Sequence, residues 1–266
     1  LLSNYLSGRD ANQGVCTQPC RWQYKVLKQE DDKYKRATSK PKTETHKNHE
    51  GNYVIEERLR PGEYHPIEED EHGSYIMNSR DMCMIDYIED LMNAGVCSFK
   101  VEGRNKSVYY AAVVAKAYRE AIDAIYEGKK PDVKQLLEEL HSAGNRGFIP
   151  GFLAGNLGAK AQWYEKNGLL QTHVFAGIIT NHNKETNEVT LAARNRIDVG
   201  DTIELITPTQ TIPITITSMT NEEGIKVNTV HPGAGSVTFN LPEDTILDSE
   251  FIVARMKGQQ KRNNFF

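Results

Sequence analysis

The chain has 266 residues, enough for one large domain or two ordinary ones with a sizeable buried core. Apolar residues make up 38% and charged residues 26%, which is typical of a soluble globular protein and excludes a disordered or fibrous one. The net charge of −4 gives no global electrostatic case for nucleic acid, so an RNA-binding surface would have to be a local patch. No apolar run approaches the roughly 20 residues that a membrane span needs, so we expect no membrane partner.

The first feature along the chain is the segment GVCTQPC, which contains Cys16 and Cys20. Two thiols at this spacing can form a disulfide, supply half of a metal site, provide one nucleophile beside an unreactive thiol, or have no role. A structural zinc site usually needs four ligands, often in two close pairs, and Cys83 and Cys97 do not form a second close pair. Those two are most simply buried small hydrophobes. With four cysteines in all and no signal-peptide pattern, we expect reduced thiols and a cytoplasmic location.

Periodicity and turn signals predict the next elements. Residues 28–50 lack apolar periodicity and predict a disordered loop. Residues 52–59 predict a strand and residues 60–73 a polar loop with turn signals. The expected elements that follow are a strand over 74–80, a helix over 84–95 ending at Gly95, a strand over 97–103, a helix over 107–128 capped by Ser107 and ended by Gly128, and a helix over 133–142.

Strands that alternate with helices at this spacing predict βαβ units with a parallel sheet. From about residue 170, short runs rich in Val, Ile and Thr, separated by turns, predict an all-β module, most simply a small barrel. The fold class is therefore α/β followed by a small all-β barrel. We expect an α/β domain over 1–150, a linker over 151–169, the barrel over 170–257 and a tail over 258–266.

The strongest local signal for chemistry lies in the predicted strand 97–103 and the residue that follows it. Lys100, Glu102 and Arg104 are at positions i, i+2 and i+4, so in a strand they share one face. A strand of a parallel α/β sheet is normally buried on both faces, and three charges there are costly unless they line a polar cavity. We therefore take these three residues as candidate catalytic groups. The alternative is an edge strand with an exposed ladder of salt bridges.

The segment NSRD at the end of the preceding predicted strand would face the same cavity. Asn78 and Ser79 can hydrogen-bond a substrate and are further catalytic candidates, and Arg80 can bind an anion. Asp81 has two interpretations, a cap of the following helix or a functional carboxylate. No dinucleotide-binding glycine motif, Walker loop, zinc-protease motif or nucleophile elbow is present.

Four long segments of the chain resemble one known family. They are LLSNYLSGRDANQGVCTQPCRWQY, EERLRPGEYHPIEEDEHGSYIMNSRDMCMIDYI, FKVEGRNKSVYYAAVVAKAYREAID and NRGFIPGFL. Together they are similar to the collagenase-like peptidase family U-32, and within it to the subgroup associated with prephenate-dependent hydroxylation of the tRNA wobble uridine. The matched segments also hold the candidate substrate-binding residues Arg60, Glu63, Tyr64 and Lys106.

The resemblance implies a TIM-barrel-like parallel α/β domain followed by a β-barrel similar to those of elongation factors. It also implies an iron–sulfur cluster, for which Cys16 and Cys20 would supply two ligands and two further cysteines upstream of Leu1 the others. We therefore expect this chain to be the C-terminal portion of a longer protein and to be inactive alone. We also expect its Cys16–Cys20 segment to be metal-free and poorly anchored.

The implied function is 5-hydroxylation of the wobble uridine, with tRNA as partner and prephenate as co-substrate. Prephenate is a dianion, and Lys100, Arg104 and Arg80 suit its two carboxylates. The first alternative is a collagenase-like peptidase. The second is a non-catalytic subunit that binds RNA or a paralogous partner subunit.

Overall fold

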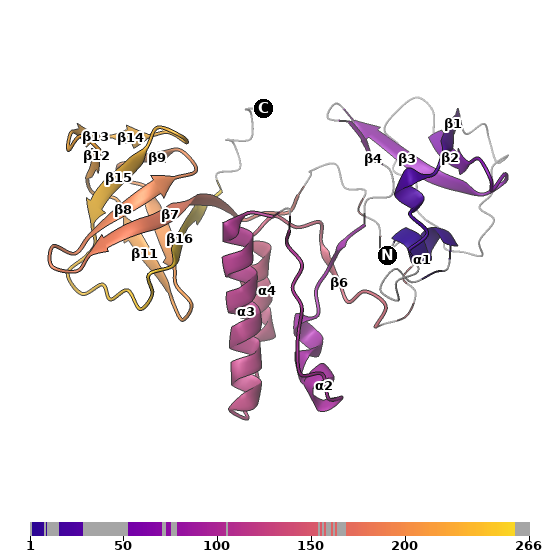
Figure 1. Cartoon of the computed structure of the whole chain (residues 1–266), viewed down its shortest axis with the longest axis horizontal. Coiled ribbons are helices and arrows are strands. Elements are labelled where there is room, and N and C mark those ends of the chain that lie inside the picture. The colour runs from indigo at the N-terminus through magenta and orange to yellow at the C-terminus, as the bar shows by residue number, and fades with distance from the viewer. Residues whose placement is uncertain are drawn as a thin grey trace. The chain divides into compact units, whose positions relative to one another are not determined.

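The computed structural model describes residues 2–7, 9, 16–28, 53–70, 73–75, 79–104, 106–153, 155, 157, 161, 163 and 169–258. The chain divides into two compact units, each described here by itself. The N-terminal unit comprises Leu1–Cys83 and Arg146–Gly168, and the C-terminal unit comprises Met84–Asn145 and Leu169–Phe266. Figure 1 colours both by residue number. Apart from Lys28 and Gly258, the predicted loop 28–50 and tail 258–266 lie outside the described residues.

The N-terminal unit contains an antiparallel sheet in the order β1-β2-β3-β4. The elements are helix α1 (Leu2–Ser7), the 3-10 helix η2 (Pro19–Arg21), β1 (Tyr24–Lys28), β2 (Tyr53–Glu57), β3 (Tyr64–Asp70) and β4 (Gly73–Tyr75). Strand β2 confirms the strand predicted over 52–59, and its Val54 and Ile55 are buried. The polar loop predicted after it is wrong in part, because residues 64–67 pair with β2. Ladder hydrogen bonds to a neighbouring strand outweigh the polar composition of this segment.

The predicted parallel sheet is not confirmed. Among the described residues, parallel pairing is limited to β5 (Asp81–Met82) and β6 (Phe148–Ile149). The strand predicted over 74–80 is represented by β4 and by an isolated bridge at Ser79. The prediction of a strand over 97–103 is wrong, since residues 96–103 have no regular secondary structure. A strand requires a hydrogen-bonded neighbour, and no described segment pairs with these residues.

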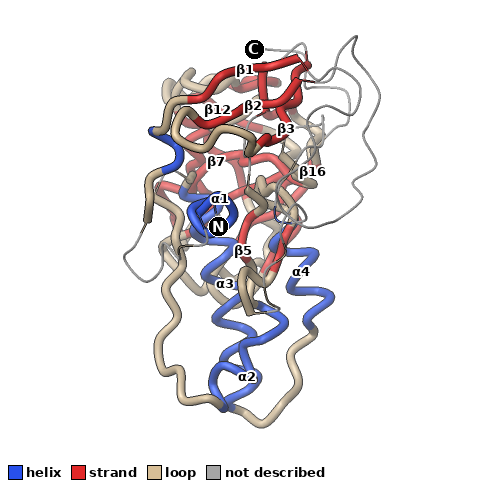
Figure 2. Tube along the Cα trace, turned by 90° about the vertical axis from the view of Figure 1, so that its right-hand side faces the viewer, coloured by secondary structure: helices blue, strands red, loops and turns tan. Residues whose placement is uncertain are grey.

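The C-terminal unit begins with helical elements that agree with the local sequence signals. They are η3 (Ile85–Tyr87), α2 (Ile88–Asn93), α3 (Val108–Tyr126) and α4 (Val133–His141). The Ser107 side chain accepts a hydrogen bond from the backbone of Tyr110, which confirms the predicted N-cap. Gly95 and Gly128 follow the ends of α2 and α3 with φ of +91° and +70°, a conformation that favours glycine. Helices α3 and α4 lie side by side (Figures 1 and 2). None of the described helices is both long and apolar enough to cross a bilayer.

The rest of this unit is a curled antiparallel sheet of eight strands in the order β11-β10-β16-β7-β8-β15-β12-β13. Its edge strands β11 and β13 do not pair with each other, so the barrel predicted over 170–257 is not closed. A separate pair joins β9 to β14. The strands are β7 (His173–Asn183), β8 (Glu188–Ala193), β9 (Ile197–Asp198), β10 (Thr202–Ile206), β11 (Thr211–Thr215), β12 (Met219–Asn221), β13 (Lys226–Val227), β14 (Thr229–Val230), β15 (Ser236–Asn240) and β16 (Ile252–Lys257).

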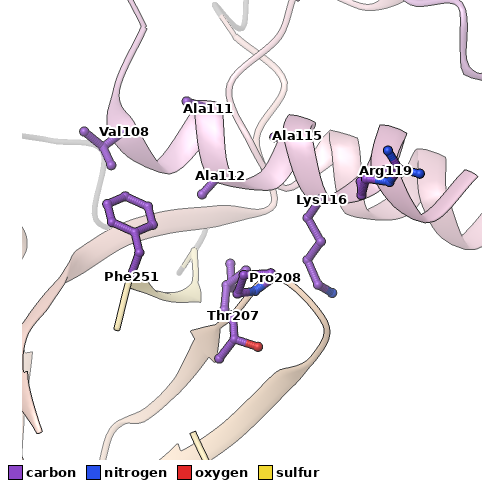
Figure 3. Close-up of a pocket in the computed structure, with 10 residues that line it drawn as sticks. Val108, Ala111, Ala112, Ala115, Lys116, Arg119, Thr207, Pro208 and Phe251 are labelled. Carbon is purple, nitrogen blue, oxygen red and sulfur yellow. The ribbon is translucent and has the colours of Figure 1, made fainter. Parts of the chain in front are cut away.

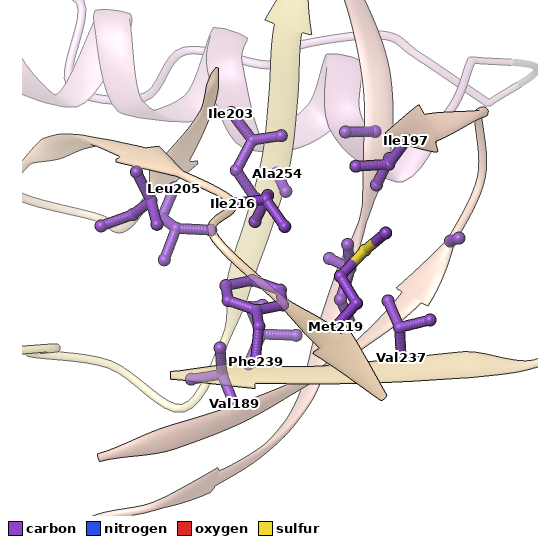
Figure 4. Packing of buried hydrophobic residues seen from close by; sticks show 14 of the residues in the cluster. Val189, Ile197, Ile203, Leu205, Ile216, Met219, Val237, Phe239 and Ala254 are labelled. Carbon is purple, nitrogen blue, oxygen red and sulfur yellow. The ribbon is translucent and has the colours of Figure 1, made fainter. Parts of the chain in front are cut away.

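The main core lies inside the curl of this sheet, where buried aliphatic side chains of most strands meet Phe239 and Met219 (Figure 4). Strand β16 contributes to two sets of contacts because alternate residues point to opposite faces. Ile252 and Ala254 belong to the main core, whereas Val253 packs in a second cluster with Tyr109 of α3. Helix α3 is thus attached to the outer face of the sheet.

Candidate functional site

The segment with the predicted cluster ligands is held against α1 by side-chain hydrogen bonds. The Thr17 hydroxyl lies 3.1 Å from the Ser3 hydroxyl and 2.9 Å from the Ser7 hydroxyl, and the Thr17 amide donates to Ser3 Oγ. The Trp22 indole nitrogen donates to the carbonyl of Thr17 at 3.0 Å. Our expectation that this segment is poorly anchored is therefore wrong. Its hydroxyl and indole groups find partners that the residue spacing did not reveal.

A polar cluster that includes the candidate Arg60 contacts residues next to the cysteines. Its guanidinium stacks 4.7 Å from the centre of the Trp22 ring, and it also donates to the carbonyl of Leu6. Tyr24 donates to the carbonyl of Pro19 at 2.8 Å. Burial, helped by the Glu57 carboxylate, raises the pKa of Tyr24 to about 12, so its hydroxyl remains a donor at neutral pH. These contacts join the candidate Arg60 to the cysteine segment within one unit.

The two thiols are of a kind that can serve as metal ligands. Cys16 and Cys20 are exposed and free, so the disulfide alternative is not realised. Cys83 is buried as predicted, but the prediction that Cys97 is buried is wrong, because it lies in an exposed segment without regular secondary structure. The Sγ atom of Cys16 accepts a weak hydrogen bond from the amide of Gln18 at 3.4 Å. Within the described part of the chain, no group of three or more His, Cys, Asp or Glu side chains could hold a metal ion. Two thiolates could supply at most two of the four ligands of an iron–sulfur site, and this role of Cys16 and Cys20 stays a prediction.

The segment around Arg80 is a second polar cluster of the N-terminal unit. Arg80 lies 4.8 Å over the Trp163 ring. Asp81 binds Arg146 through its side chain at 2.7 Å and accepts the Arg146 backbone N–H at 3.0 Å. The helix-cap interpretation of Asp81 is wrong, because η3 begins after Met84 and Asp81 instead joins two chain segments. Ser79 is half-buried beside this cluster in sequence, and Asn78 lies outside the described residues.

The predicted charged strand residues belong to the C-terminal unit and are exposed to solvent. Lys100, Glu102 and Arg104 lie in a segment without regular structure, and Glu102 Oε1 accepts the backbone N–H of Arg104 at 2.8 Å. The argument that a strand places them on one buried face therefore fails. Lys106 is half-buried, with its ammonium 5.2 Å from the centre of the Tyr110 ring. The catalytic and binding roles of these four residues stay predictions.

Two further candidates lie near Arg60 in sequence. Glu63 forms a loose ion pair with Arg60 at 3.7 Å, with both side chains partly exposed. Tyr64 is the first residue of β3 and is half-buried. The structure thus brings together Arg60, Glu63 and the cysteine segment, whereas the charged residues between 100 and 106 belong to the other unit.

A buried ionic network in the C-terminal unit was not predicted. Arg255 of β16 is only 5% exposed and donates to both carboxylate oxygens of Glu139 at 2.8 and 2.9 Å, to Glu204 at 2.6 Å and to Ser142 at 2.8 Å. The Tyr109 hydroxyl donates to Ser142 at 2.9 Å. Burial lowers the pKa of Arg255, but the hydrogen bonds and charges of Glu139 and then Glu204 outweigh it and hold that pKa above its ordinary value. This network connects α3, α4, β10 and β16.

His173 borders the same network. Its Nε2 atom lies 3.7 Å from Glu204. Burial, followed by the positive charge of Arg255, lowers the pKa of His173 below its ordinary value, against the opposing effect of Glu204. The only sequence signal for the network was an arginine within the otherwise apolar run FIVARM. The network holds helices on the sheet, and its members are already paired with one another.

The fold and these sites define a protein with a cysteine-bearing N-terminal unit and a curled β-sheet with attached helices. Peptidase family U32 matches residues 1–163, and the Peptidase family U32 C-terminal domain matches residues 171–252. Since the first match covers more than half of the chain, the chain belongs to peptidase family U32. The family predicted from the four sequence segments is confirmed.

Among curated relatives, tRNA hydroxylation protein P of Escherichia coli (strain K12) is 38% identical over 275 residues, which covers 99% of this chain and 60% of that protein. tRNA hydroxylation protein P1 of Bacillus subtilis (strain 168) is 28% identical over 244 residues, covering 91% of this chain and 51% of that protein. The chain therefore spans between half and three-fifths of the length of these relatives.

A relative with a different description is the collagenase of Porphyromonas gingivalis, which is 32% identical over 147 residues, or 54% of this chain and 40% of that protein. Among solved structures, the C-terminal domain of a Geobacillus thermoleovorans protein assigned to the U32 peptidases is 21% identical and covers 32% of this chain and 92% of that domain, with a TM-score of 0.28.

Proposed function

We propose that this protein acts in tRNA modification, as an enzyme or enzyme subunit in the prephenate-dependent 5-hydroxylation of the wobble uridine in the cytoplasm. The observation that supports this most is the 38% identity to the Escherichia coli tRNA hydroxylation protein P across 99% of the chain. A match of this extent includes both units. Because the chain covers only 60% of that relative, the activity proposed here is that of the whole protein.

In this proposal Cys16 and Cys20 supply two thiolate ligands of an iron–sulfur cluster, which when bound provides one-electron chemistry. The contacts of Thr17 with Ser3 and Ser7 keep the segment between the thiols in place. Both thiols are exposed and hence available to a cluster whose other ligands come from elsewhere. Because a ligating thiol must be deprotonated, cluster binding would release protons from this segment.

Recognition of the co-substrate requires cations that are accessible to an anion. Lys100 and Arg104 are exposed, and neither forms an ion pair with any described residue. Arg80 belongs to the N-terminal unit, where its guanidinium covers the Trp163 ring. We propose that Lys100 and Arg104 bind carboxylates of prephenate, with Arg the better group for bidentate contact.

Nucleoside mass spectrometry tests this proposal. We expect tRNA from cells lacking the gene to lose 5-hydroxylated uridine, and the complete gene to restore it. Genes carrying Cys16→Ser or Arg104→Ala should fail to restore it, whereas the control Lys130→Ala, at another exposed site, should succeed. Normal levels of the modified uridine in the deletion strain would exclude the proposed function. Restoration by Arg104→Ala would exclude only the assigned role of Arg104.

The similarity to the Porphyromonas gingivalis collagenase favours peptide hydrolysis as a second candidate function. Gelatin cleavage by the anaerobically purified complete protein, together with its visible absorption spectrum, distinguishes the two functions. Iron–sulfur absorption that disappears in Cys16→Ser, without gelatin cleavage, supports tRNA hydroxylation. A colourless protein that cleaves gelatin supports the peptidase function.

A further inference from the structure

A cavity of about 510 Å³ lies on the C-terminal unit, between α3 and the turn that connects β10 to β11 (Figure 3). Seven of the ten residues that line it are apolar. They include Ala111, Ala112 and Ala115 on the helix and Ile206, Pro208 and Phe251 opposite. This size is within the range of small-molecule sites, which combine apolar walls with a few polar groups.

The cavity exists because α3 presents small side chains where larger ones would fill the space. Alanine methyl groups at three positions leave space that a longer side chain would occupy. The apolar side chains at the mouth are consequently accessible to solvent, with Phe251 56% exposed and Val108 43% exposed. Apolar surface gathered in a concavity gains free energy when a ligand removes it from water.

One cation at the side of this cavity lacks a neutralising partner. Lys116 extends from α3 toward the turn (Figure 3), and its ammonium donates only to the Thr211 hydroxyl, at 3.3 Å. No described carboxylate lies within ion-pair distance of it. The other cation of the cavity, Arg119, is already bound to Asp123 on the same helix.

The carboxylates that share a cavity with Lys116 line a second cavity, separate from the apolar one. Glu120 and Glu139 line a neighbouring polar cavity of about 350 Å³ that Lys116 also borders. Glu139 is held there by Arg255, at 2.8 Å. An anion that approaches the ammonium from the apolar cavity therefore meets no acidic side chain among the residues that line it.

We propose that this cavity binds a small amphipathic monocarboxylate, with its apolar body against the alanines and Phe251 and its carboxylate on Lys116. A single available cation matches a single negative charge. An RNA strand would need several cations for its phosphates, and a neutral ligand would accept a hydrogen bond from the ammonium without the added attraction of opposite charges. This inference is independent of the proposed tRNA function, because it uses none of the residues assigned there.

Isothermal titration calorimetry of the complete chain with octanoate and its neutral analogue octanamide tests the proposal. We expect octanoate to bind about tenfold more tightly than octanamide, as one charge-assisted hydrogen bond implies. Lys116→Met should remove this preference and Lys116→Arg should keep it. Ala115→Phe should abolish binding of both probes, because the ring would occupy the cavity.

The matched control is Lys130→Met, which removes an exposed lysine away from the cavity and should leave octanoate binding unchanged. Since Ala115→Phe could disturb folding, octanoate-induced shifts of the Ala111 and Ala115 amide signals in the unsubstituted protein provide a second readout. Equal affinities for the two probes, no binding of either, or shifts confined to other regions would overturn the proposal. Loss of wobble-uridine hydroxylation in cells would leave it unaffected.

Discussion

Replacement of Arg255 by Met should destabilise the C-terminal unit strongly. Met retains much of the length and apolar stem of the side chain but removes three charge-assisted hydrogen bonds of 2.6 to 2.9 Å. The carboxylates of Glu139 and Glu204, whose side chains are 20% and 24% exposed, would be left without their cation. Removing one partner of a buried ion pair costs about 3 to 5 kcal/mol. Because both carboxylates keep some contact with water, we expect the lower value, about 3 kcal/mol.

Amide hydrogen exchange of β10 and β16 measures this loss within the unit concerned. A decrease of about 3 kcal/mol should accelerate exchange through global opening roughly a hundredfold. Arg119→Met is the control, because it breaks the exposed Arg119–Asp123 pair on α3 and should change exchange little. Adding Glu204→Gln to Arg255→Met should recover part of the stability, since it removes one uncompensated charge. Acceleration of less than about fivefold, or a double variant no more stable than the single one, would refute this reasoning.

Three further predictions follow from burial and backbone geometry. The pKa of His173 is lower in the folded protein than in the unfolded chain, so as the pH falls the unfolded chain binds a proton at a higher pH than the folded protein does. The free energy of unfolding should therefore decrease as the pH falls below 6.5, and His173→Gln should weaken that decrease in urea denaturation. Gly147→Ala should lower the melting temperature more than Gly62→Ala. Both positions have positive φ, but an added Cβ would lie 2.5 Å from a side-chain nitrogen of Arg80 at position 147 and in open space at position 62. Cys83, which is 7% exposed, should resist iodoacetamide in the native protein while exposed Cys97 reacts, and mass spectrometry that finds both labelled equally would contradict this.

The features that were predicted correctly depend on residues close together in the chain. Ser107 caps α3 because its hydroxyl reaches an amide three residues away. Gly95 and Gly128 follow helices because glycine adopts positive φ without steric cost. The runs rich in Val, Ile and Thr after residue 170 similarly form strands, because β-branched residues favour extended backbone.

The errors concern features that depend on distant parts of the chain. Residues 97–103 have strand-like composition but no described pairing partner, so the shared face inferred for Lys100 and Glu102 is not formed. Closure of the β-sheet likewise depends on whether β11 meets β13, which no local pattern encodes.

The sequence by itself determined the family, the Ser107 cap, the glycines that end two helices, and the strand-rich region after residue 170, because each depends on neighbouring residues or on long matched segments. Only the tertiary structure decided which polar groups share a site. Arg255 binds the carboxylates of Glu204 and Glu139, which are 51 and 116 residues away in the chain. The Thr17 hydroxyl contacts that of Ser3, which is 14 residues away. Hydrogen bonds act over about 3 Å, so such groups meet only after the chain has folded.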